Sequence, residues 1–201
     1  TNGVIYSASF ADSYDANIPD AYYRSTKQYL ETPNTFTATF KVASGTPGRI
    51  GSIIGNYAGS YSTSTKHPTN SINLEINDKG QLRFYWDTGN PDVVFTSKDF
   101  RTGLWEHVTV VRDVKNSCFH LYNNGVLLET KTTNTGNDIT GIFAPAIGND
   151  LRHSDSVNLP FKGHIKNVAV YSDALSSQEV AVEYATEDKK TITKETNEKL
   201  L

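Results

Sequence analysis

The chain of 201 residues lacks several features that define whole classes of protein. It has one cysteine, Cys118, which excludes an internal disulfide and a cysteine-based zinc site. No apolar run approaches the roughly 20 residues of a membrane-spanning helix. Basic residues are not in excess, since 19 Lys and Arg stand against 22 Asp and Glu. These absences argue against a disulfide scaffold, membrane insertion and binding to a nucleic-acid backbone.

The motifs of common hydrolases and metal sites are also missing. No G-x-S-x-G, H-E-x-x-H or EF-hand spacing occurs. A glycosidase needs two carboxyl groups flanking the sugar, but Glu75 has Asn73 and Asn77 at the alternate positions and stands as a single acid. His107 and His120 are candidates for a zinc pair across a sheet, but no third ligand is evident. We therefore expect a protein without catalytic activity.

The chain begins with Thr1 and carries no signal peptide, so we expect a mature fragment of a longer, multidomain protein. Its length suits one large domain. We expect that domain to span residues 1–186. Residues 187–201, rich in Lys, Glu and Thr, are expected to form a charged helix or a linker.

Alternation of apolar and polar residues runs through most of the chain and predicts β-strands separated by polar turns. The expected strands are Gly3–Phe10, Thr35–Val42, Arg49–Tyr57, Ser71–Ile76, Gln81–Asp87, Val93–Thr96, Glu106–Asp113, Ser117–Asn123, Val126–Thr130, Ala144–Asn149 and Phe161–Tyr171. One helix is expected after the capping box formed by Ser176 and Glu179. The pattern predicts an all-β protein, a jelly-roll β-sandwich of two antiparallel sheets with one short C-terminal helix.

The segment Ser71–Asp87 has the clearest two-faced pattern. In both of its arms the even-numbered residues, from Ile72 to Trp86, are apolar, and the odd-numbered residues are polar or tyrosine. The even-numbered face is therefore expected to lie in the core and the other face in solvent. On the same reasoning we assign both Trp86 and Trp105 to the core.

If successive strands form one meander, a single outer face collects planar hydrogen-bonding groups, aromatic rings and charges of both signs. Its members are Asn73, Glu75, Arg83, Tyr85, His107, Thr109, His120 and Tyr122. Amide, carboxylate and guanidinium groups make paired hydrogen bonds with sugar hydroxyls, so this face indicates a carbohydrate site. A polar outer face is also the ordinary state of an antiparallel sheet, in which a pair such as Glu75–Arg83 only supports the strands.

An acidic loop is expected at Ala11–Asp20. Its Asp12 and Asp15 are candidates to hold one structural calcium ion, because calcium is bound by about six to eight carboxylate and carbonyl oxygens. Ordinary solvated aspartates of a turn explain the same composition equally well.

Four segments also carry a family pattern in order along the chain. They are Leu104–Val110 with W-x-H-V-x-V, Phe119–Gly125 with L-Y-x-N-G, Ala146–Asn149 with I-G, and Phe161–Tyr171 followed by Ala174-Leu175-Ser176. This ordered set resembles the laminin-G-like modules of the concanavalin A-like lectin and glucanase superfamily, from about Asn34 to Tyr184. The resemblance implies the jelly-roll fold and does not specify a ligand.

Two of these segments are similar to the sialic-acid-binding modules attached to bacterial sialidases. In Ile147–Arg152 an I-G strand is followed by an arginine, as in those modules, and Phe161–Tyr171 contains their I-x-N-x-x-V-Y ending. Their strand matching Gln81–Tyr85 presents Glu-x-Arg outward, whereas this chain has Arg83-x-Tyr85. The resemblance implies that Arg152 is a further ligand-binding residue, which together with Arg83 is able to hold a carboxylate.

These observations predict a non-catalytic carbohydrate-binding module of a secreted or cell-surface protein, with a glycan as its partner. The predicted ligand-binding residues are Asn73, Glu75, Arg83, Tyr85, His107, His120, Tyr122 and Arg152. Two alternatives stay open, namely a protein-binding adhesion module of the same fold and a glycoside hydrolase whose acids lie on loops.

Overall fold

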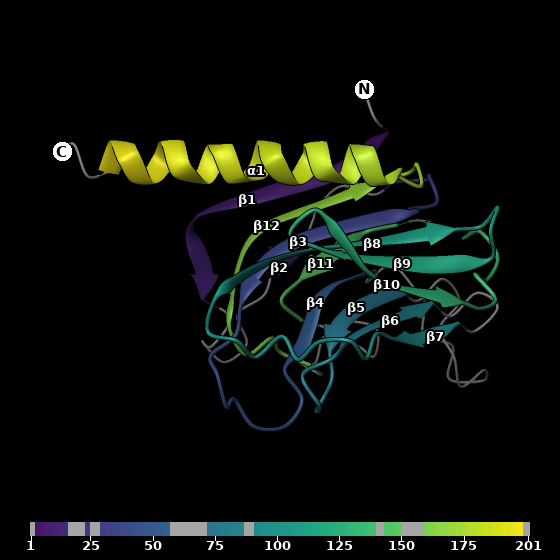
Figure 1. Ribbon diagram of the computed structural model, residues 1–201, viewed down its shortest axis with the longest axis horizontal. Coiled ribbons are helices and arrows are strands. Elements are labelled where there is room, and N and C mark those ends of the chain that lie inside the picture. Colours follow the sequence, from purple (N-terminus) through teal and green to yellow (C-terminus); the bar gives the residue numbers. More distant parts are fainter. Residues whose placement is uncertain are drawn as a thin grey trace.

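The computed structural model describes residues 3–15, 23–24, 29–56, 72–86, 91–139, 143–149 and 159–198. Over these residues the chain forms twelve strands and one helix. The strands lie in two layers, and helix α1 (Ser177–Glu198) runs along the outside of one of them (Figure 1). Within this described part, no helix is both long enough and apolar enough to span a membrane.

Two six-stranded antiparallel sheets form a β-sandwich. From edge to edge, the first sheet contains β1 (Val4–Asp15), β12 (His164–Tyr171), β3 (Thr35–Lys41), β8 (Trp105–Asp113), β9 (Cys118–Asn123) and β10 (Val126–Thr132). The second sheet contains β2 (Tyr23–Arg24), β11 (Pro145–Ile147), β4 (Gly51–Asn56), β5 (Ile72–Ile76), β6 (Leu82–Trp86) and β7 (Asp92–Val94). This architecture confirms the predicted all-β jelly-roll sandwich.

The space between the sheets is filled by apolar side chains, many of them aromatic. From β5 and β6 it receives the fully buried Ile72, Leu74, Ile76, Leu82, Phe84 and Trp86. The odd-numbered residues of both strands point to the other face, as predicted. The expectation that this face lies in solvent was wrong for Asn73 and Glu75, which are fully buried. The prediction was wrong for Trp105, which is 38% exposed because it shares the outward phase of His107 in β8.

Helix α1 begins at the predicted capping box. The backbone N–H of Ser176 donates to Oε2 of Glu179 at 2.8 Å, and the backbone N–H of Glu179 lies 3.3 Å from Oγ of Ser176. These reciprocal bonds satisfy backbone donors at the start of the helix, where no preceding carbonyl is available.

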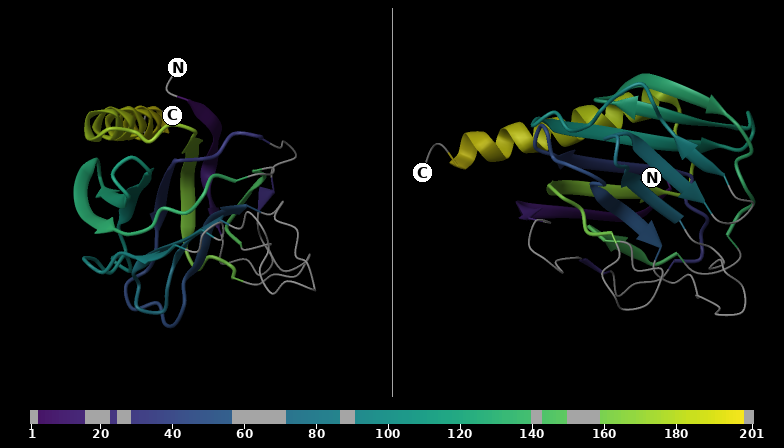
Figure 2. Two further views of the ribbon diagram at one scale, coloured as in Figure 1. Left: turned by 90° about the vertical axis from the view of Figure 1, so that its right-hand side faces the viewer. Right: turned by 90° about the horizontal axis from the view of Figure 1, so that it is seen from below.

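The helix covers part of the outer face of the first sheet (Figure 2). A small apolar cluster joins them, consisting of Val111, Tyr122, Tyr171, Leu175 and Val180. Burial, assisted by the nearby Glu183 and Glu187, raises the pKa of the Tyr171 phenol to about 12. The predicted domain boundary at residue 186 falls within this continuous helix, and the boundary itself stays a prediction.

The acidic segment near the N-terminus is a strand as far as Asp15, which lies opposite His164 of β12. The prediction of a loop over Ala11–Asp20 was therefore wrong for residues 11–15. The side chains of Asp12 and Asp15 lie outside the described part of the chain, so calcium binding there stays a prediction.

Candidate functional site

The eight predicted ligand-binding residues do not share one surface. Strands β5 and β6 belong to the second sheet and β8 and β9 to the first, so the expected single meander was wrong. The outer face of the second sheet carries Asn73, Glu75, Arg83 and Tyr85, and the outer face of the first carries His107, His120 and Tyr122. Arg152 lies outside the described residues.

Glu75 lies at the centre of the outer face of the second sheet and is fully buried. It is opposite Arg83 in β6 and Ser52 in β4. Its Oε1 accepts hydrogen bonds from Arg49 and, at 2.8 Å, from Nη1 of Arg83, while Oε2 accepts one from Nδ2 of Asn73 at 2.9 Å. Both carboxylate oxygens are therefore engaged by the protein, and Glu75 positions two guanidinium groups.

Asn73 is also fully buried and bonded within the sheet. Its Oδ1 accepts a hydrogen bond from Oγ of Ser52, and its Nδ2 donates to Glu75. A buried polar chain whose members are all bonded is rigid and holds one geometry. Asn73 and Ser52 thus act as a support beneath the arginines.

The exposed part of this face, which we call the arginine face, consists of Arg49, Arg83, Tyr85 and Asp92. The side chains of Arg49, Arg83 and Asp92 are 40%, 25% and 45% exposed. Nε and Nη2 of Arg83 donate to the two carboxylate oxygens of Asp92 at 2.7 and 2.6 Å. The guanidinium carbon of Arg83 also lies 5.7 Å from the centroid of the Tyr85 ring, within the range of a cation–π contact.

The electrostatics of the arginine face favour ligands that both donate and accept hydrogen bonds. The bond to Asp92, opposed by desolvation and reinforced by Glu75, raises the pKa of Arg83 above its ordinary value, so the residue is always charged. Its bonds to Glu75 and Asp92 use one N–H on each nitrogen and leave one on Nη1 and one on Nη2. Sugar hydroxyls match such a combination of free guanidinium donors and an exposed carboxylate acceptor.

Arg49 and Asp92 were not predicted from the sequence. Arg49 precedes β4 and reaches Glu75 only because β4 pairs with β5, which the local pattern does not indicate. Asp92 begins β7 and lies opposite Tyr85. The sequence does contain a signal for Asp92: it precedes the apolar Val93, so the alternation of the strand places Asp92 on the same outward face as Tyr85.

Helix α1 covers two of the predicted residues. Nε2 of His107 lies 2.9 Å from Oε2 of Glu183, and Nδ1 lies 2.9 Å from Oγ1 of Thr39. The His107 ring also lies 5.3 Å from that of Tyr184, and Tyr122 is only 5% exposed. The expectation that these two side chains face solvent was therefore wrong, and their role as ligand residues stays a prediction. Their outward phase was right, but a helix occupies the space in front of them.

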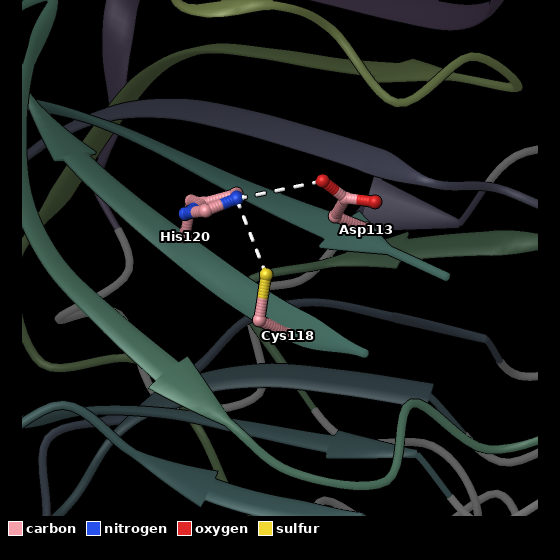
Figure 3. A group of neighbouring side chains, drawn as sticks. All are labelled: Asp113, Cys118 and His120. Atoms are coloured by element: carbon pink, nitrogen blue, oxygen red, sulfur yellow. Dashed lines mark hydrogen bonds and ion pairs between the residues drawn. The ribbon is translucent and has the colours of Figure 1, made fainter. Parts of the chain in front are cut away.

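His120 lies on the same outer face of the first sheet, in a group with Asp113 and Cys118 (Figure 3). The β8–β9 register places Asp113 opposite Cys118 and Val111 opposite His120. His120 is therefore not opposite His107, and the zinc pair considered from the sequence does not form. Burial, assisted by Asp113, raises the pKa of the Cys118 thiol. This group is separate from the arginine face, which belongs to the other sheet.

A family model described as the concanavalin A-like lectin/glucanases superfamily matches residues 16–181. No curated protein sequence matches the chain significantly.

Several solved structures have a similar fold. The Ruminococcus gnavus IT-sialidase CBM40, bound to α2,3-sialyllactose, has a TM-score of 0.57 at 20% identity, over 76% of this chain and 83% of that one. The leech intramolecular trans-sialidase has a TM-score of 0.58 at 17% identity, over 90% and 28% of the two chains. The NanB sialidase from Streptococcus pneumoniae has a TM-score of 0.59 at 18% identity, over 90% of this chain and 28% of that one. The chain therefore spans less than a third of either sialidase.

Proposed function

Because the chain belongs to the concanavalin A-like lectin/glucanases superfamily, we propose that it is a carbohydrate-binding module whose ligand site is the arginine face. The observation that carries this proposal is the pair of guanidinium groups that reach solvent, the exposed Arg49 and the partly buried Arg83, held by one buried carboxylate, Glu75. Burying the charge of Glu75 costs hydration free energy that an apolar residue in the same position would not lose. Stabilising the sheet therefore does not by itself explain a carboxylate at this position. Donors held in place before the ligand arrives, by contrast, increase affinity.

The ligand we favour is a glycan that ends in sialic acid. The R. gnavus module, which has a similar fold, is bound to sialyllactose. Sialic acid carries a carboxylate, and arginine binds carboxylates through paired hydrogen bonds. Arg49 is available for that carboxylate, while Arg83 and Asp92 are placed to bind hydroxyls. Arg152 is retained as a further ligand residue of the proposal.

We propose a binding role without catalysis. Retaining and inverting glycosidases need two carboxyl groups, about 5–10 Å apart, on either side of the scissile bond. Glu75 has no exposed surface and both oxygens are bonded, so it does not reach a glycosidic oxygen. The proposed role is to hold a secreted or surface protein, such as a glycan-degrading enzyme, on its glycan. Calcium held by Asp12 and Asp15 is part of the same proposal.

Replacing Arg83 with alanine is expected to lower glycan affinity by about 10-fold or more, because a hydrogen bond to a charged group contributes roughly 1.5–3 kcal/mol. A glycan array of sialylated and neutral sugars, followed by calorimetry on the best ligand, measures this. Arg101→Ala is the matched control, since Arg101 makes the same bidentate pair with exposed Asp99, at 2.9 and 2.6 Å, outside the arginine face. A wild-type chain that binds no glycan class, or an unchanged affinity in Arg83→Ala, would contradict the proposal.

Replacing Asp92 with asparagine is expected to shift specificity towards anionic sugars. Asp92 lies on the same face as Arg49 and repels a ligand carboxylate bound there, and an exposed charge interaction of about 1 kcal/mol corresponds to a roughly fivefold change in affinity. The measurement is the ratio of dissociation constants for sialyllactose and lactose in the two proteins. A variant that binds sialyllactose less tightly than wild type would show that the site is not built for an anion.

One observation favours the alternative of a protein-binding adhesion module. Strand β10 is an edge of the first sheet and exposes three apolar side chains, Val126, Leu127 and Leu128, which are 70%, 49% and 37% exposed. An exposed apolar sheet edge is a surface to which another polypeptide adds readily. Binding of a protein partner that free sugars do not displace would favour this alternative over the glycan module.

A further inference from the structure

Asp113, Cys118 and His120 form a compact group that the proposed glycan site does not use. We propose that these three residues bind a zinc ion at the hairpin between β8 and β9. Their donor atoms, a carboxylate oxygen, the thiol sulfur and an imidazole nitrogen, all lie within 4.8 Å of one another. The three side chains, which come from two neighbouring strands, point towards one another (Figure 3).

Two of the three donor–donor distances in this group are close to the edges of a zinc tetrahedron. Zinc bonds of about 2.0–2.3 Å to nitrogen, oxygen and sulfur place tetrahedral ligands roughly 3.4–3.6 Å apart. Nε2 of His120 lies 3.3 Å from Sγ of Cys118 and 3.7 Å from Oδ2 of Asp113. The third pair, Sγ of Cys118 and a carboxylate oxygen of Asp113, lies within 4.8 Å, so side-chain shifts of roughly 1 Å or less bring the three donors around one ion.

Neighbouring side chains already orient two of the three ligands. Nδ1 of His120 is 2.8 Å from Oγ1 of Thr130 in β10, which leaves Nε2 for a metal. Asn116 donates to both oxygens of Asp113, through its backbone N–H at 3.0 Å and its Nδ2 at 2.7 Å. Such contacts hold the imidazole ring and the carboxylate of a zinc site in the orientation that binds the metal.

The chemistry of the donors selects zinc over the common hard cations. Calcium and magnesium take oxygen ligands, whereas zinc takes thiolate, imidazole and carboxylate together. The sequence led us to expect no cysteine-based zinc site, and that expectation was too broad. One cysteine excludes a site that needs several thiolates, whereas the mixed set proposed here needs only Cys118. The side chains of His120 and Asp113 are 23% and 21% exposed, so the ion enters from solvent and a water molecule completes its coordination.

Metal titration of the reduced, intact chain tests the proposal, with cobalt as a spectroscopic probe and zinc as competitor. We expect one equivalent of cobalt to produce a thiolate-to-cobalt charge-transfer band, and one equivalent of zinc to remove it, while calcium has no effect. Cys118→Ser is expected to abolish the band, and His120→Gln to weaken zinc binding by at least about 10-fold. His164→Gln, which changes another histidine of the first sheet, is the matched control and should bind zinc like wild type.

Thermal unfolding distinguishes loss of the metal site from loss of the fold. Cys118→Ser replaces a single atom, so the variant is expected to fold, and its unfolding transition shows whether it does. Zinc should raise the Tm of the wild-type chain and leave that of folded Cys118→Ser unchanged, since only ligands of the native state stabilise it. The proposal is overturned if saturating cobalt gives no charge-transfer band, or if zinc binds Cys118→Ser and His120→Gln as tightly as wild type. Removal of metal should leave glycan affinity unchanged, because the arginine face lies on the other sheet.

Discussion

Replacing Glu75 with glutamine is expected to lower the free energy of unfolding by about 2–4 kcal/mol. Removing one partner from a fully buried ion pair costs roughly 3–5 kcal/mol, and the effect here is smaller because Arg49 and Arg83 reach solvent. Glutamine has nearly the same shape as glutamate, but it removes the carboxylate to which Arg49 is bonded and leaves Arg83 paired with Asp92 alone. It also replaces one of the two acceptor oxygens with an NH2 group, which faces the donor Nδ2 of Asn73 when the remaining oxygen stays with the arginines.

The same substitution should impair glycan binding even though Glu75 touches no sugar. Without the carboxylate, Arg49 loses the partner that orients it and is repelled by Arg83, which Asp92 alone then holds, so the hydrogen bonds of Arg49 to a ligand lose strength. Calorimetric unfolding measures the stability, where a loss of this size lowers Tm by roughly 5–15 °C. Asp99→Asn is the matched control, because it breaks an arginine–carboxylate pair whose carboxylate is 50% exposed, and we expect little change in its Tm.

A double substitution identifies the cause of the destabilisation. If the uncompensated charge is responsible, Arg83→Gln should cost less in the Glu75→Gln background than in wild type, with a coupling energy of about 0.5–3 kcal/mol. Additive effects of the two substitutions, or a Tm for Glu75→Gln equal to that of Asp99→Asn, would show that the buried carboxylate does not hold the arginines. The stability result stands on its own, whatever ligand the arginine face binds.

Much of the fold could be predicted from local alternation, because an antiparallel strand with one buried face repeats every two residues. The β5–β6 hairpin, its turn and its two faces follow directly from the residues between Ile72 and Trp86. Alternation fixes the faces of a strand but not its neighbours. The pairing of β8 with β3, where Val110 lies opposite Phe36, depends on tertiary packing between distant segments and could not be read locally. Strand β2 could not be predicted either, because two residues are too few to show an alternation of apolar and polar side chains.

The part of the candidate site that could be predicted from the sequence is the part that lies within one hairpin, β5–β6. Glu75 and Arg83 were placed together correctly because they are cross-strand neighbours. Arg49 was missed because it joins them across a pairing that the sequence does not encode locally. His107 has the predicted outward phase, but helix docking depends on tertiary contacts that no strand pattern contains. The error over Trp105 was avoidable, because its odd number places it on the same face as His107.

Replacing Trp86 with alanine is expected to lower the free energy of unfolding by about 3–5 kcal/mol, because it removes a large core side chain and leaves a cavity. Trp86 is fully buried and also has two polar partners. Its Nε1 donates to the carbonyl of Asn137 at 2.9 Å, and the guanidinium carbon of Arg112 lies 4.5 Å from its ring centroid. All three interactions are lost together in the alanine variant.

The Trp86→Ala substitution should also destabilise the loop after β10, because Arg112 holds that loop beside Trp86. Nε and Nη2 of Arg112 donate to the carbonyls of Thr135 and Gly136, at 2.7 and 2.9 Å, while the residue itself is only 1% exposed. Without the indole, this buried cation loses its aromatic partner and Asn137 loses its donor. We therefore expect amide hydrogen exchange at residues 135–138 to accelerate more than in the rest of the sandwich.

The two tryptophans of the chain provide the control for this prediction. Trp105→Ala removes the same side chain from the outer face of the first sheet, where the ring is 38% exposed and lies near Lys41 and Lys166, so it should change stability by no more than about 1 kcal/mol. Trp86→Phe should fall between the two, since it keeps an aromatic ring for Arg112 but loses the N–H group. Urea unfolding of the three variants measures this order. Equal losses in Trp86→Ala and Trp105→Ala would mean that neither the core cavity nor the contact with Arg112 contributes as the structure indicates.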